Sequence, residues 1–137
     1  MLKKLLSAGN HTGTTNLALL IFRVGVGAMM LTHGYPKFQR LIAGEFRFGD
    51  PLGLGVEVSL VLAVLAEFVG SILIILGLGT RLAAIPQMIT MAVAWFIVHI
   101  DDPFGTQEKA ALYLLCFLTL FITGAGHYSL DKKLFNK

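Results

Sequence analysis

The sequence predicts an all-α integral membrane protein, a four-helix antiparallel bundle with both termini in the cytoplasm. The 137 residues are 55% hydrophobic and 14% charged, whereas an ordinary soluble domain is about 25% charged. Four apolar runs alternate with polar or glycine-rich stretches, and no run breaks into short alternating strands. The length fits one domain. Together these observations predict helices that lie in lipid.

The chain begins with a short, basic and polar lead-in, residues 1–16, which we expect at the cytoplasmic interface. The start resembles a signal-peptide n-region, but its apolar core comes late and contains Arg23, so we expect the segment to be retained. The first span is residues 17–34, closed by the sequence HGYP. A glycine-rich segment follows, with a short interfacial helix expected around Phe38–Ile42.

The other three spans are predicted at residues 56–78, 82–100 and 109–125. A tight turn, GLGTR, joins the second span to the third, and Pro86 lies close to the third helix's start, where proline is tolerated. A polar link, DDPFGTQ, leads to the fourth span. Residues 17–128 therefore form the predicted membrane domain, and residues 129–137 form a basic cytoplasmic tail.

Basic residues collect on one predicted side of the membrane. Cytoplasmic segments carry the excess of lysine and arginine, and here that excess lies at both termini and in the turn after the second span, which predicts a multi-pass protein with both termini in the cytoplasm. The residues are Lys3, Lys4, Arg81, Lys132, Lys133 and Lys137, against one acid, Asp131.

Glu67 is a carboxylate near the middle of the second span, where an ionised group costs on the order of 3 kcal/mol. Arg23 lies ten residues before His33, and Glu67 lies ten residues after Glu57. Both would then lie roughly 15 Å below the outer surface. We therefore expect Arg23 and Glu67 to form an ion pair, which could equally fix the helix register or serve a ligand.

Other polar side chains are expected to surround this pair in a cavity that opens outward. Gln87, Met91, Trp95 and His99 recur every fourth residue on one helix face, a pattern that core packing also produces. Such a cavity suits an amphipathic ligand with a polar head, for example a quinone. The predicted floor is Arg23, Glu67, Gln87 and Trp95, and the predicted mouth is His33, Lys37, Glu57, His99, Asp101 and Lys109.

Several classes of site are not predicted. The lone cysteine, Cys116, excludes an intrachain disulfide, and the scattered basic residues argue against nucleic-acid binding. His33 and His99 lie on separate segments without tight ligand spacing, so no metal site is expected. The sequence has no haem, flavin or iron–sulfur signature.

Six motifs follow one another along the chain: Arg23, the HGYPKF sequence that starts at His33, Glu67, residues 77–84, Glu108-Lys109 and residues 124–131. In these motifs the chain resembles the DoxX family of small four-span membrane proteins over about residues 17–131. The resemblance implies a bacterial inner-membrane protein associated with quinone-linked oxidoreductases, more as an accessory subunit beside an oxidoreductase partner than as an independent enzyme. A small-solute transporter and a structural or assembly factor are alternative functions, and a second copy of the chain, in a homo-oligomer, is an alternative partner.

Overall fold

The computed structural model describes residues 1–136 and contains helices but no strand in that part of the chain. Three helical segments are long and apolar enough to cross a membrane: Gly13–Ile42, Val56–Leu76 and Thr80–Val98. The predicted all-helical membrane protein is thus confirmed. In order, the elements are α1 (Leu2–Leu5), α2 (Gly13–Ile42), α3 (Val56–Val64), η1 (Leu65–Val69), α4 (Gly70–Leu76), α5 (Thr80–Val93), η2 (Ala94–Val98), α6 (Phe104–Thr123) and α7 (Leu130–Phe135).

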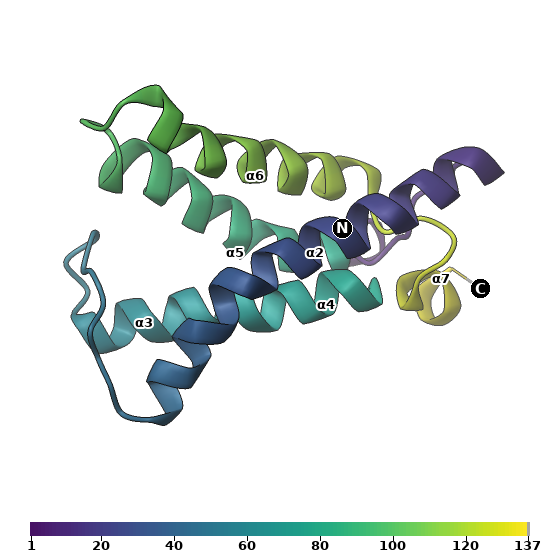
Figure 1. The fold of residues 1–137 in the computed structure, drawn as a ribbon. Helices are drawn as coiled ribbons and strands as arrows, with labels where there is room; N and C mark the ends of the chain where they lie inside the picture. Colours follow the sequence, from purple (N-terminus) through teal and green to yellow (C-terminus); the bar gives the residue numbers. More distant parts are fainter. Residues whose placement is uncertain (137) are drawn as a thin grey trace.

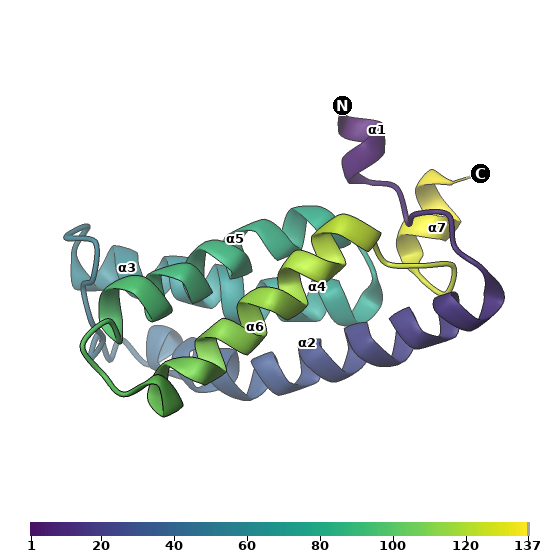
Figure 2. The same ribbon diagram turned by 90° about the horizontal axis from the view of Figure 1, so that it is seen from above.

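The long helices lie side by side, and the short elements gather at their ends (Figures 1 and 2). The small helices α1 and α7 lie at one end, here called the terminal end. The loop 43–55 and the link 99–103 lie at the other, here called the cavity end. Helix α6 packs mainly on α5 and touches α2 only sparsely. The buried core between the helices includes Val26, Met30, Ile74, Ala84, Phe117 and Leu120.

Helix α2 does not end at the HGYP sequence, contrary to the prediction; it runs to Ile42 with Pro36 inside it. The expected interfacial helix, Phe38–Ile42, is its last turn. A proline inside a helix costs about 3 kcal/mol, so tertiary packing must outweigh that cost. Phe38 stacks on Phe68 with ring centroids 4.3 Å apart and planes within 5°, which holds the continued helix against the second span.

The close approach of α2 to η1 depends on Gly34. A Cβ at this position would overlap the backbone of Glu67 and Phe68. The missing side chain therefore lets the two backbones touch, and it places the last turns of α2 over η1.

Two helical segments each contain one π-helical turn, which the periodic sequence pattern did not predict. The segment η1 interrupts α3–α4 and carries Glu67, and η2 follows α5 and carries Trp95. A π turn inserts one extra residue into a helix, redirects the side chains around it, and occurs frequently at functional sites. The segment η1 lies at the middle of the helix 56–76, whereas η2 ends the third span at the cavity end.

Candidate functional site

Arg23 does not pair with Glu67, so the predicted ion pair is wrong. Its guanidinium is buried, with 2% of the residue exposed, and it donates to main-chain carbonyls at the terminal end. Nη1 reaches Ala125 O at 2.7 Å, and Nη2 reaches Tyr128 O at 2.9 Å and Ile75 O at 3.4 Å. The depth estimate failed because it took His33 as the end of a helix that continues to Ile42.

Two further polar residues join separate segments at the terminal end by hydrogen bonds. Neither was predicted from the sequence as a site residue. Asp131 is buried, and its carboxylate accepts from the backbone N–H of Gly79 at 2.6 Å and of Thr80 at 3.0 Å, which caps α5. Asn16 accepts from the His127 N–H at 2.9 Å. Asp131 could have been suspected, because it is the only acid in the basic tail.

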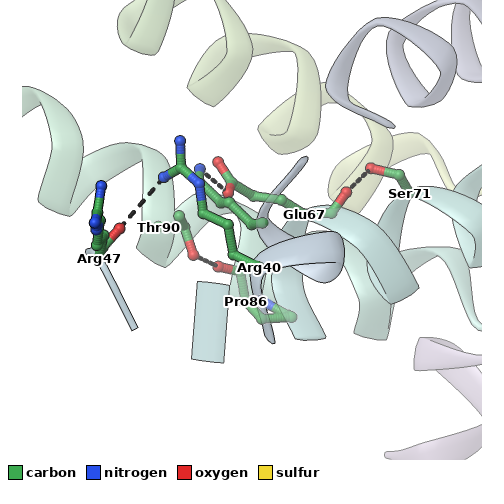
Figure 3. Close-up of polar contacts among 7 residues, drawn as sticks. Arg40, Arg47, Glu67, Ser71, Pro86 and Thr90 are labelled. Carbon is green, nitrogen blue, oxygen red and sulfur yellow. Dashed lines mark hydrogen bonds and ion pairs between the residues drawn. The ribbon is translucent and has the colours of Figure 1, made fainter. Parts of the chain in front are cut away.

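Glu67 forms its ion pair with Lys37 instead. Only 3% of Glu67 is exposed, while the Lys37 side chain is 24% exposed. Lys37 reaches the carboxylate because α2 continues through Pro36, and its ammonium also lies 5.8 Å from the centroid of the Phe48 ring. Behind the pair, Ser71 Oγ donates to the Glu67 carbonyl at 2.5 Å (Figure 3).

The Glu67–Lys37 pair faces a cavity of about 180 Å³ at the cavity end of the bundle. Its walls include Met30 and Met91, and the ring of His33 meets that of Tyr113 edge-on at 5.8 Å. One predicted floor residue and four predicted mouth residues therefore come together. The polar and aromatic lining consists of His33, Lys37, Glu67, His99, Thr106, Lys109 and Tyr113.

The other predicted site residues lie outside this cavity. Trp95 Nε1 donates to Gln107 Oε1 at 3.0 Å and so ties η2 to the start of α6. Gln87 is fully buried in the core. Glu57 is exposed in the first turn of α3, and Asp101 is exposed in the link before α6.

The cavity is rich in basic groups. Lys37 is paired with Glu67, and the His99 ring lies 2.6 Å from a carboxylate oxygen of Asp102. Lys109 forms no ion pair within residues 1–136. The site therefore offers hydrogen-bond donors beside apolar walls, which suits a ligand whose head carries acceptor oxygens. Within residues 1–136 no group of three or more histidine, cysteine or acidic side chains is placed to hold a metal ion.

Fold and site define a helical membrane protein with a basic cavity between its helices. The DoxX family model matches residues 18–100, and the chain belongs to that family. A Bacillus subtilis protein named "Putative oxidoreductase CatD" is 32% identical over 120 residues, which cover 87% of this chain and 88% of that protein. No solved structure matches the chain.

Two proteins of Haemophilus influenzae, both described only as uncharacterized, are also similar. One is 38% identical over 130 residues, covering 87% of this chain and 92% of the relative. The other is 30% identical over 125 residues, covering 85% and 83%. These relatives match the present chain over most of their own length, so the shared unit is nearly the whole protein in each.

Proposed function

We propose that this DoxX protein is the quinone-binding membrane subunit of an oxidoreductase in the cell inner membrane. In this proposal α6 is a fourth span beside the three apolar segments, and residues 17–128 form the membrane domain. Residues 1–16 and 129–137 then lie in the cytoplasm, and the cavity opens outward. The lysines near both termini support this orientation through the positive-inside rule.

The observation that carries the proposal is the Glu67–Lys37 ion pair on the wall of a cavity. Buried ionisable groups in membrane helices are costly and commonly mark ligand or proton sites. This pair lies in and beside a π turn, a feature frequent at functional sites. Because the carboxylate faces a space that a ligand can enter, it can act on that ligand directly.

The cavity lining fits a quinone head. The two carbonyl oxygens of a quinone accept hydrogen bonds, and Lys109, His33 and Tyr113 carry donors around the cavity. Met30 and Met91 provide apolar walls for the ring. In the proposed reaction, two electrons from a substrate oxidised by the partner subunit and two protons convert quinone to quinol. Lys37 and Glu67 would exchange protons with the head.

The name of the Bacillus subtilis relative supports a redox association. That name describes the relative alone, and it specifies neither a quinone nor a partner. The proposed ligand therefore depends on the cavity of this chain.

A quinone without a tail tests the site. Trp95 is the only tryptophan, and its neighbour Ala94 lines the cavity. A quinone bound in the cavity should therefore quench the fluorescence of Trp95. We expect saturable quenching in the wild type and an affinity at least about ten-fold lower in Glu67→Gln and in Lys109→Gln. Glu57→Gln, outside the cavity, is the matched control. Absence of saturable binding, or wild-type affinity in both cavity variants, would overturn the proposal.

Two alternatives give different outcomes. A transporter would carry solute into liposomes by itself. We expect no uptake, because fully buried apolar residues, including Ile74, Phe117 and Leu120, pack the bundle core. A purely structural pair predicts that Glu67→Gln and Lys37→Met each destabilise the fold, while the double variant regains stability and the wild type binds no quinone.

A further inference from the structure

A second hollow adjoins the cavity, on the side where α2 and α6 face each other. It is a groove of about 620 Å³, several times larger than the cavity. Val26 and Met29 from α2 and Leu112 and Cys116 from α6 give it apolar walls, and α6 also contributes the charged Glu108 and Lys109. We refer to it below as the α2–α6 groove.

The groove and the cavity share two side chains, Lys109 and Tyr113. The two hollows are therefore adjacent, and these residues form the boundary between a polar compartment and an apolar one. Lysine suits such a boundary, because its methylene stem can lie along apolar atoms while its ammonium reaches a polar group. A molecule with a polar head and an apolar tail would meet matching surfaces on the two sides of this boundary.

The groove also opens toward lipid. Met29 and Leu112 are both 55% exposed, and they lie on helices whose outer faces are apolar, as is usual for helices in a bilayer. Because α6 packs on α5 and touches α2 only sparsely, the seam between α2 and α6 is the least tightly closed side of the bundle. A hydrophobic chain could enter there without crossing water.

We propose that the α2–α6 groove is a lateral entrance from the bilayer and binds the prenyl tail of the quinone whose head occupies the cavity. The head position depends on the proposed function, whereas the tail position depends on the groove itself. Leu112 lies where the tail would pass, and Lys109 and Tyr113 lie where the head and tail join. A bulky side chain at Leu112 should therefore exclude the tail and leave the head site intact.

The test compares two quinones with the same head, one with a prenyl tail and one without, and measures their binding by equilibrium dialysis because the variants add a second tryptophan. The blocking variant is Leu112→Trp, and the matched control is Leu115→Trp, since Leu115 is 59% exposed on the same helix and does not line the groove. We expect Leu112→Trp to weaken binding of the prenyl quinone at least about ten-fold and to leave the tail-less quinone unchanged. Leu115→Trp should change neither affinity.

A second blocking variant, Met29→Trp, approaches the groove from α2 and should reproduce the effect of Leu112→Trp. Thermal unfolding in detergent identifies any variant that fails to fold. Equal loss of both quinones, or unchanged affinity for the prenyl quinone in both blocking variants, would overturn the tail site. Retention of phospholipid alone by the wild type would overturn it as well. If the tail-less quinone fails to bind the wild type while the prenyl quinone binds and is sensitive to Leu112→Trp, the proposed head site fails and the groove stands.

Discussion

Arg23 and Glu67 are both charged residues buried in apolar helices, and both are at most 3% exposed. Their surroundings differ. The guanidinium of Arg23 donates to three backbone carbonyls at the terminal end. Glu67 has a side-chain partner, Lys37, and lies on the wall of a cavity. Burial is the same in the two cases, and the partners distinguish them.

This difference separates a structural charge from a candidate functional one. Backbone carbonyls cannot leave Arg23 without unfolding the segments that supply them, so its network fixes the C-terminal loop onto α2 and α4. A side-chain ion pair can open when a ligand enters, because only rotamers must change. We therefore expect the terminal end to serve stability and, under the proposed function, the cavity end to serve binding.

The largest expected effect is on stability, from Arg23→Gln. The shorter, uncharged side chain would leave the carbonyls of Ala125 and Tyr128 without their charged donor, and breaking a buried charged network costs about 3–5 kcal/mol. Thermal unfolding in detergent measures the loss. Arg40→Gln, an exposed arginine that donates to Arg47 O at 3.3 Å, is the control and should change stability by less than about 1 kcal/mol. Wild-type stability of Arg23→Gln would contradict the structural assignment.

Gly34→Ala should lower both stability and quinone affinity, and we expect a smaller stability cost of about 1–3 kcal/mol. The new methyl group would overlap the Glu67 backbone, so α2 must move away from η1 and Lys37 must move with it. Quinone affinity should therefore fall together with stability. Gly25→Ala is the control, because a Cβ there meets nothing within 4 Å. It should stabilise the helix by about 0.5–1 kcal/mol.

The sequence predicts the all-helical class and three apolar spans because long apolar runs are enough to identify membrane helices. It also predicts five of the eleven residues that line the cavity. Besides Glu67 these are His33, Lys37, His99 and Lys109, which all lie near ends of apolar runs, and helix ends on the same side of a membrane meet. Glu67 was identified as a site residue, but its partner was not. The partner depends on α2 continuing through Pro36, which local propensity disfavours and packing on Phe68 permits.

The missed features depend on contacts between distant parts of the chain. Asn16 meets His127, and Asp131 caps a helix that begins at Thr80. Neither partner is visible from local pattern. The π turns were missed because a single inserted residue barely changes a 3.6-residue period, although it redirects Glu67. The predicted depth of Arg23 was wrong because it was counted from His33, whereas the helix ends at Ile42.

Asp131→Asn tests the terminal end with a moderate effect. The carboxylate accepts two backbone N–H groups at the start of α5, and loss of a helix cap costs about 0.5–2 kcal/mol. An asparagine keeps one acceptor oxygen, so we expect the lower half of that range, measured by thermal unfolding in detergent. Asp101→Asn, at an exposed position in the link, should leave stability unchanged. A loss of quinone affinity in Asp131→Asn would contradict the division between the two ends.

The smallest expected effect comes from Gln87→Leu. This substitution tests whether a third buried polar side chain contributes to stability or to quinone binding. Gln87 is fully buried, and neither amide atom has a hydrogen-bond partner within residues 1–136. Replacing an unpaired buried amide with an apolar side chain of similar size should be neutral or stabilising by about 1 kcal/mol. Quinone affinity should stay unchanged, because Gln87 does not line the cavity.

The matched control for Gln87→Leu is Met91→Leu, one turn along the same helix. Met91 lines the cavity, so this substitution should alter quinone affinity slightly while leaving stability within about 1.5 kcal/mol. If Gln87→Leu instead weakens quinone binding and Met91→Leu does not, the Gln87 amide acts on the ligand from beneath the cavity. An unpaired side-chain amide would then also indicate the binding end. The kind of hydrogen-bond partner, backbone or side chain, would no longer be enough to distinguish the two ends of the bundle.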